Sequence, residues 1–179
     1  IAYNDGPFSY PPASGIGLEQ EESAGYDLGV AWYSSDGLYL EANYFDQTIS
    51  DEIFFDLDTF SGYLQASGDN DSRGIELMAE WPLSAALSLS GNYTYNDTDT
   101  SAGAQRIRRP EHLANLGISW QPMGERLTLS LFARGSWDSI DIDGSSLDDY
   151  EVVDINASYA VLPSLEVYAR MENLFDEDY

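Results

Sequence analysis

Apolar and polar residues alternate with a period of two along most of this 179-residue sequence. A period of two places the two kinds of side chain on opposite faces of an extended strand, so the pattern predicts β-strands. No segment has a convincing helical period. The predicted strands are eight segments, at about 22–34, 38–49, 73–81, 86–96, 111–121, 127–137, 151–161 and 165–175. The fold class is therefore predicted to be all-β.

The connections between these segments are alternately short and long. The short ones are turns of a few residues, and the first, Ser34-Ser35-Asp36-Gly37, contains the Asp-Gly pair that favours a tight hairpin. The long ones cover about 50–72, 97–110 and 138–150. In an antiparallel up-and-down sheet, this alternation places every short turn at one end and every long loop at the other. Such asymmetry is typical of transmembrane β-barrels of the outer membrane.

Large aromatic residues lie toward both ends of the predicted apolar faces. Amphipathic rings favour the two membrane–water interfaces, where they form girdles around a barrel. Each predicted strand also has ~9–11 residues, the length that a tilted strand needs to cross the hydrocarbon. The predicted girdle residues are Trp32, Trp81 and Trp120 at the short-turn end, and Trp137, Tyr44, Tyr93 and Tyr95 at the long-loop end.

The composition excludes several classes of protein. The chain has 32 acidic and 7 basic residues and a formal net charge of −25. Nucleic acid is therefore not expected as a partner, because phosphate binding requires clustered cations. Cys is absent and His occurs once, so neither a thiolate metal site nor a nucleophile–base pair is visible, and an enzyme is not expected. No run of about 20 apolar residues predicts a transmembrane helix.

Five short motifs occur in order along residues 18–179. They are Leu18-Glu19-Gln20-Glu21-Glu22-Ser23 followed by Tyr26-Asp27-Leu28-Gly29, Tyr44-Phe45 followed by Ile49, Asp51 and Ile53, Gly74-Ile75-Glu76-Leu77, Arg108-Arg109-Pro110-Glu111-His112, and Asn173-Leu174-Phe175-Asp176-Glu177-Asp178-Tyr179. Together they resemble the C-terminal part of the barrel of TonB-dependent outer-membrane receptors. Gln20 stands where the family motif usually has Pro.

The resemblance implies an antiparallel up-and-down transmembrane β-barrel of about 22 strands around a plugged lumen, of which this chain would supply about eight. Residues 1–179 would then be a partial barrel domain, without the plug domain and the last strand. The implied location is the bacterial outer membrane. The implied function is uptake of a scarce ligand, a ferric siderophore or a cobalamin-like corrinoid. The implied partners are outer-membrane lipid and lipopolysaccharide, a small-molecule metal chelate, and a TonB-type energy-coupling protein that acts through the missing N-terminal part.

Two sets of loop residues are candidates for ligand binding. The aromatic set either stacks on a ligand or packs the longest loop. The basic set either attracts an anionic chelate or pairs with neighbouring carboxylates. The aromatic candidates are Phe54, Phe55, Phe60 and Tyr63, and the basic candidates are Arg106, Arg108 and Arg109.

The acidic loop at 138–150 is a candidate metal site. An EF-hand needs an acidic ligand at its twelfth position, but a count from Ser139 places Tyr150 there. A true EF-hand is therefore not expected, and no cofactor is expected beyond loosely bound calcium. The candidate calcium ligands are Asp141, Asp143, Asp148 and Asp149.

Two alternatives remain open from the residues alone. One is a complete eight-stranded outer-membrane barrel that serves as an adhesin or anchor, since eight strands are enough to close a barrel. The other is a soluble, acidic, calcium-dependent β-sandwich that acts as a binding module. A sandwich would bury the apolar faces against a second sheet, whereas a transmembrane barrel would expose them to lipid.

Overall fold

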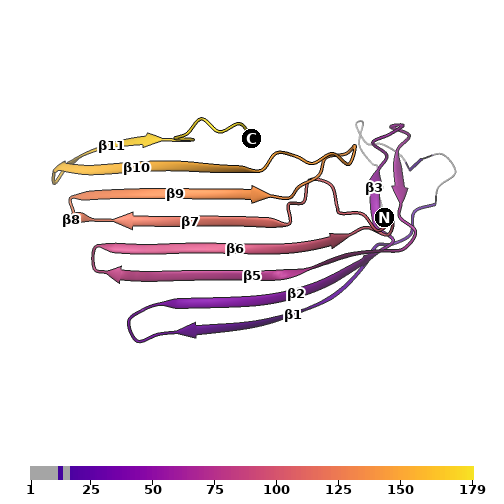
Figure 1. Ribbon diagram of the computed structural model, residues 1–179, viewed down its shortest axis with the longest axis horizontal. Helices are drawn as coiled ribbons and strands as arrows, with labels where there is room; N and C mark the ends of the chain where they lie inside the picture. The colour runs from indigo at the N-terminus through magenta and orange to yellow at the C-terminus, as the bar shows by residue number, and fades with distance from the viewer. Residues whose placement is uncertain (1–11, 14–16) are drawn as a thin grey trace.

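One large antiparallel sheet dominates the computed structural model, which describes residues 12–13 and 17–179 (Figure 1). Its strand order is β1-β2-β5-β6-β7-β9-β10-β11. The bounds are β1 (Glu22–Tyr33), β2 (Tyr39–Ser50), β5 (Asp69–Ser84), β6 (Leu87–Asp99), β7 (His112–Trp120), β9 (Leu127–Trp137), β10 (Tyr150–Leu162) and β11 (Leu165–Met171). A separate hairpin consists of β3 (Ile53–Phe55) and β4 (Tyr63–Gln65). The short β8 (Pro122–Glu125) belongs to the connection that joins β7 to β9 along the chain. The prediction of an up-and-down, all-β fold is confirmed.

The eight predicted strands are all present, but several bounds differ. β5 begins at Asp69 instead of 73, because residues 69–72 continue to pair with the end of β2. β11 ends at Met171 instead of 175, because Asn173 has a positive φ of 49° that interrupts the extended backbone, although the Leu174 backbone amide still donates to the Val153 carbonyl of β10 at 2.8 Å. There the Asn173 backbone N–H donates to Asp154 Oδ1 at 2.9 Å. Strand lengths consequently run from 7 residues in β11 to 16 in β5.

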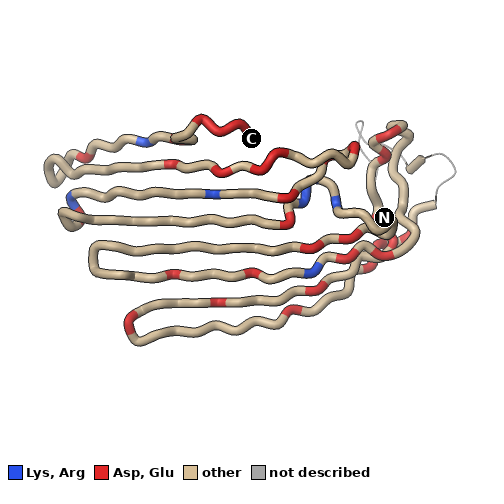
Figure 2. The backbone as a smooth tube through the Cα atoms, viewed as in Figure 1, with Lys and Arg blue, Asp and Glu red and all other residues tan. Residues whose placement is uncertain are grey.

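The loops follow the predicted asymmetry. In Figure 1 the short turns lie at one end of the sheet and the long connections at the other. The longest connection is not irregular throughout, since it contains the β3–β4 hairpin, which projects beyond the loop end. Figure 2 shows that Asp and Glu also gather toward the loop end and in the C-terminal segment.

Strand register places most of the apolar residues of the sheet on one face, with Met78 and Phe132 among the exceptions on the other. Directly paired residues of antiparallel strands share a face. One such row runs across six strands, through Leu28, Tyr44, Ile75, Tyr95, His112 and Trp137. The next row toward the loops contains Tyr26, Asp46, Arg73 and Asp97, so the apolar face ends there. We call the apolar side the outer face and the other side the inner face.

The sheet has no second layer over it within the described residues. Only Ala13 and Val152 are buried hydrophobic residues in that part of the chain. On the outer face, Leu28 is 72% exposed and Leu116 is 46% exposed. A sandwich would bury these side chains, so the sandwich alternative is wrong. The closed eight-stranded alternative is also not formed by the described strands, since β1 and β11 remain separate sheet edges.

No helix among the described residues is long and apolar enough to span a membrane.

Candidate functional site

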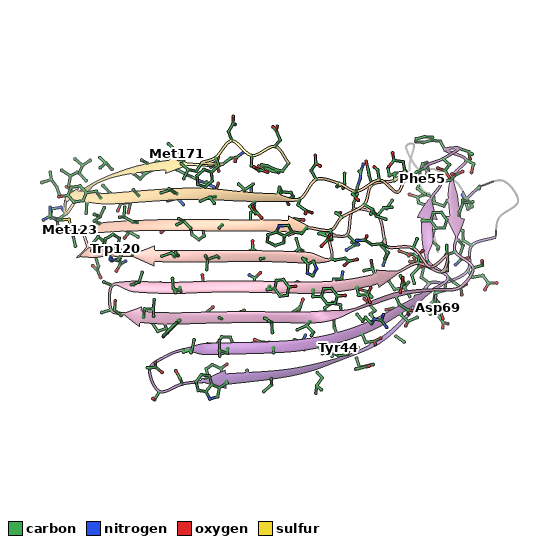
Figure 3. All side chains as sticks on the ribbon, in the orientation of Figure 1. Tyr44, Phe55, Asp69, Trp120, Met123 and Met171 are labelled. Atoms are coloured by element: carbon green, nitrogen blue, oxygen red, sulfur yellow. The ribbon has the colours of Figure 1, made fainter. Side chains whose placement is uncertain are left out.

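The predicted girdle residues lie on the outer face, toward its two ends. Trp32, Trp81 and Trp120 are 40–53% exposed at the short-turn end. In Figure 3, Trp120 lies near the short turns and Tyr44 lies nearer the loops. At the loop end, the Tyr93 hydroxyl oxygen is 2.7 Å from His112 Nδ1, and the Tyr95 ring centroid is 5.2 Å from that of His112. The lone His therefore belongs to an aromatic cluster. That these rings contact lipid headgroups stays a prediction.

Trp137 occupies its girdle position in a different way. Its indole covers Gly135, where an added Cβ would lie only 2.2 Å from the indole ring. Its Nε1 donates to Glu151 Oε1 at 3.0 Å. The absence of a side chain at Gly135 thus lets the indole lie flat on the outer face, with its polar edge satisfied.

The inner face carries polar and charged side chains. Asn115 Nδ2 donates to Asn92 Oδ1 at 2.9 Å across β6 and β7. A hollow on this part of the sheet is lined by residues that include Glu80, Phe132 and Arg134. The Arg134 guanidinium lies over the Tyr179 ring, 5.5 Å from its centroid. A polar inner face opposite an apolar outer face is the arrangement of a barrel wall with an aqueous or protein-filled lumen.

The β3–β4 hairpin is organised around the Asp56 carboxylate, which is buried at 8% exposure. Its oxygens accept hydrogen bonds from the Ser61 hydroxyl at 2.6 Å, from the Thr59 hydroxyl, and from the Asp58 and Thr59 amides at 3.1 Å. These donors, the Ser61 hydroxyl first, hold the pKa of Asp56 well below its usual range, because they stabilise the charged form. The sequence analysis missed Asp56. An Asp followed by Thr and Ser in a loop is typical of such side-chain-to-backbone turns and could have indicated it.

The four aromatic candidates lie in this hairpin. The Phe55 ring lies edge-on to Tyr63 at 5.6 Å and to Phe60 at 6.0 Å, measured between centroids. Phe54 and Phe60 are nevertheless 45% and 67% exposed. The hairpin therefore combines an aromatic cluster with rings that face solvent, and binding of a ligand by these residues stays a prediction.

The three basic candidates differ in their surroundings. Arg106 pairs with Glu52 at the base of the hairpin, and Asn70 Nδ2 donates to the same carboxylate. Arg108 Nε is 2.9 Å from Asp141 Oδ1. Arg109 is exposed and makes no ion pair within the described part of the chain. Glu52 and Asn70 were missed because their partners lie far away in sequence and share no local pattern with them.

The acidic candidates at 138–150 are engaged separately. Asp141 pairs with Arg108, whereas Asp143 Oδ1 accepts from the Ser145 hydroxyl at 2.6 Å. The Ile142 backbone amide, followed by Arg108, lowers the pKa of the Asp141 carboxyl. The Ser145 hydroxyl, followed by the Ser145 backbone amide, lowers the pKa of the Asp143 carboxyl. Asp149 accepts from the Asp138 amide, and Asp148 is exposed. No group of three or more His, Cys, Asp or Glu suited to a metal is found among residues 12–13 and 17–179. Loosely bound calcium stays a prediction.

A one-layer sheet with an exposed apolar outer face, a polar inner face and one-sided loops defines a segment of outer-membrane barrel wall. The family model described as TonB dependent receptor-like, beta-barrel, matches residues 2–174. The chain belongs to this family, which consists of receptors and transporters of the bacterial outer membrane.

Similar proteins include vitamin B12 and siderophore transporters. The chain is 25% identical over 182 residues to the vitamin B12 transporter BtuB of Vibrio cholerae, covering 95% of this chain and 28% of that protein. It is 26% identical over 192 residues to the ferrichrome outer membrane transporter/phage receptor of Escherichia coli, covering 96% and 25%. The chain thus spans about a quarter of the length of these relatives.

Solved structures of the same kind share the fold. The ferripyoverdine receptor of Pseudomonas aeruginosa superposes with a TM-score of 0.74 at 21% identity, covering 93% of this chain and 25% of that one. The ferric-catecholate import receptor Fiu of E. coli gives a TM-score of 0.73 at 22% identity, covering 97% and 27%. The predicted resemblance and the predicted barrel class are confirmed.

Proposed function

We propose that this chain is part of the wall of an energy-coupled receptor that takes up a scarce ligand through the outer membrane. The ligand would be a cobalamin-like corrinoid or a ferric siderophore. The observation that carries the proposal is the two-faced sheet, apolar on the outside and polar on the inside, in a chain of this family. Its relatives named for vitamin B12 and for ferrichrome support the two ligand classes.

The proposed role of this segment is to position ligand-binding side chains, and no chemical reaction is proposed for it. The loop end offers exposed aromatic surface at Phe54 and Phe60, and Arg109 as a cation that the described residues leave without an ion pair. Aromatic rings and a cation suit a metal chelate with conjugated ligands. Arg106 and Arg108 would instead hold the loops in place through Glu52 and Asp141. Neither an enzymatic activity nor nucleic-acid binding is proposed.

The proposed partners follow from the two faces and from the family. Outer-membrane lipid and lipopolysaccharide would cover the outer face, and the chelate would enter from the loop end. A TonB-type protein would supply energy through a part of the receptor outside this chain. These assignments concern the whole receptor, of which the chain is about a quarter by comparison with its relatives.

Uptake by cells tests the proposal directly. We expect a strain that lacks the full-length receptor to lose uptake of labelled vitamin B12 or of ferrichrome, the ligands named for two relatives. Uptake should also stop when the proton-motive force is dissipated, while binding at the cell surface persists. Uptake that continues without an energised inner membrane would contradict energy coupling. Normal uptake of vitamin B12 in the deletion strain would contradict the corrinoid, and normal uptake of ferrichrome would contradict ferrichrome as the siderophore.

A further inference from the structure

The outer face has an apolar hollow that spans β1, β2, β5 and β6. Its volume is about 540 Å³. Its floor consists of Ala42, Ala79 and Gly91, and larger side chains around it include Trp32, Leu77 and Tyr93. Register explains the shape, since Ala79 pairs directly with Gly91 and so leaves two neighbouring positions almost without side chains.

Nothing in the described part of the chain fills this hollow at Gly91, whereas a side chain does cover the similar position at Gly135. Both glycines lie on the outer face. At Gly135 the chain covers its own depression with the Trp137 indole. At Gly91 the nearest side chain to an added Cβ is Leu116, whose Cδ1 would be 3.8 Å away, in ordinary contact. The hollow at Gly91 is therefore open to the medium that surrounds the outer face.

The surroundings of the outer face limit what can occupy the hollow. Water is a poor occupant, because apolar cavities without polar partners stay dry. A void would forfeit dispersion contacts along its whole lining. Trp32 lies two residues before the Ser34–Gly37 turn, so the hollow begins near the short-turn end of β1 and extends from there toward Tyr93, on the loop side. In an outer-membrane barrel the short turns face the periplasm, and the lipid on that side is phospholipid.

We propose that the hollow lined by Ala42, Ala79 and Gly91 binds one acyl chain of a phospholipid from the periplasmic leaflet. A flexible chain can follow the floor and contact the rim on both sides. A flat wall would offer contact on one side only. The bound lipid is therefore retained longer than the lipids around the rest of the barrel. This inference goes beyond the proposed function, because it concerns the outer face and not the transported ligand.

Native mass spectrometry of the full-length receptor tests the inference. The receptor would be exchanged from phosphatidylethanolamine vesicles into mild detergent and stripped of loosely bound lipid. We expect the wild type to retain one phosphatidylethanolamine. Ala79→Leu and Ala42→Leu, which fill the floor from two different strands, should each lose it. Ala157→Leu is the matched control, since Ala157 lies on the same outer face in β10, outside the hollow, and its variant should retain the lipid.

Three results would overturn the inference. They are the absence of retained lipid in the wild type, equal retention in the wild type and both floor variants, and equal loss in Ala157→Leu. Two floor variants are used so that the test survives if one of them fails to fold, as judged by strand circular dichroism. Ligand uptake should be unchanged in both floor variants. A loss of lipid with normal uptake separates this inference from the proposed function.

Discussion

The sheet and the β3–β4 hairpin are stabilised in different ways. The sheet consists of long backbone ladders with both faces open, and only Ala13 and Val152 are buried hydrophobic residues among those described. The hairpin is short but has its own interior, the Asp56 carboxylate and the rings packed on Phe55. Under the proposed function, lipid and neighbouring strands would stabilise the sheet from outside, whereas the hairpin is stabilised by its own side chains.

The largest expected effect comes from a charge on the outer face of the sheet. Leu131 pairs with Ile118 and Ile155 on that face, and Ser130 beside it points to the inner face. In liposomes we expect Leu131→Arg to lower the unfolding free energy of the full-length receptor by about 2–4 kcal/mol, because a charge near the bilayer midplane is poorly solvated. Ser130→Arg should cost less than about 1 kcal/mol. Equal costs in denaturant titrations would contradict the assignment of faces.

The second effect is confined to the hairpin. Removing the Asp56 carboxylate by Asp56→Ala leaves the Ser61 and Thr59 donors without their acceptor. We expect amide exchange within residues 53–65 to rise by roughly tenfold, since a buried donor left unsatisfied is costly. Asp58→Ala is the control, because only the Asp58 backbone amide contributes to the network. A matching rise in the sheet would show that the hairpin and the sheet are not independent.

Lowering the pH should reduce the stability of the same hairpin. The pKa of Asp56 is lowered in the folded state. Its contribution to stability is therefore complete above the ordinary Asp value of about 3.9 and is lost as pH falls through the lower folded value. Exchange in the hairpin, corrected for its intrinsic pH dependence, should stay flat between neutral pH and about pH 4 and rise below it. A rise that begins near neutral pH would exclude Asp56 as the titrating group.

A smaller effect is expected where the hairpin joins the neighbouring loop. Arg106 and Glu52 are both only about one-fifth exposed, at 20% and 22% of their side chains. Arg106→Gln should destabilise this loop contact by about 1 kcal/mol, the upper end for an ion pair near the surface. The readout is faster exchange of the Ser101 amide, which donates to Asn70 Oδ1 at 2.8 Å next to the pair. Unchanged exchange there would mean that the pair does not couple the two loops.

The smallest effect is expected at Arg108. Its side chain is 63% exposed, and its partner Asp141 is 33% exposed. Arg108→Gln should cost no more than about 0.5 kcal/mol and should cost less still in high salt, because exposed pairs are screened. A large, salt-independent loss would instead indicate that Arg108 has a role that the ion pair does not explain.

The same contrast explains what could be predicted from the sequence. The strands and their faces were predictable, because a period of two and short turns are local signals that the register then preserves across all strands. The β3–β4 hairpin was missed, because its strands have only three residues each, too few to show an alternation. The early end of β11 was missed as well, because the positive φ of Asn173 and its backbone hydrogen bond to Asp154, 19 positions away, leave no local pattern in the sequence.

The residue types of the candidate site could be predicted from the sequence, but the interaction partners of these residues could not. Aromatic and basic residues in the loops stand out in the sequence, and the structure places Phe55, Phe60 and Tyr63 together. The pairing of Arg106 with Glu52 joins residues 54 positions apart, which no local pattern can indicate. Ligand contact by Phe54, Phe60 and Arg109 stays a prediction.

Spin labels on neighbouring residues of β7 give the most direct test of the outer face as a lipid contact. Labels at Leu116 and Asn115 of the full-length receptor in liposomes would be compared for collision with oxygen, which enters lipid, and with a water-soluble nickel complex. The two residues point to opposite faces of the sheet. We predict that Leu116 is accessible to oxygen and shielded from nickel, and that Asn115 has lower oxygen accessibility than Leu116. A Leu116 label that is shielded from both reagents, or as open to nickel as to oxygen, would contradict the account.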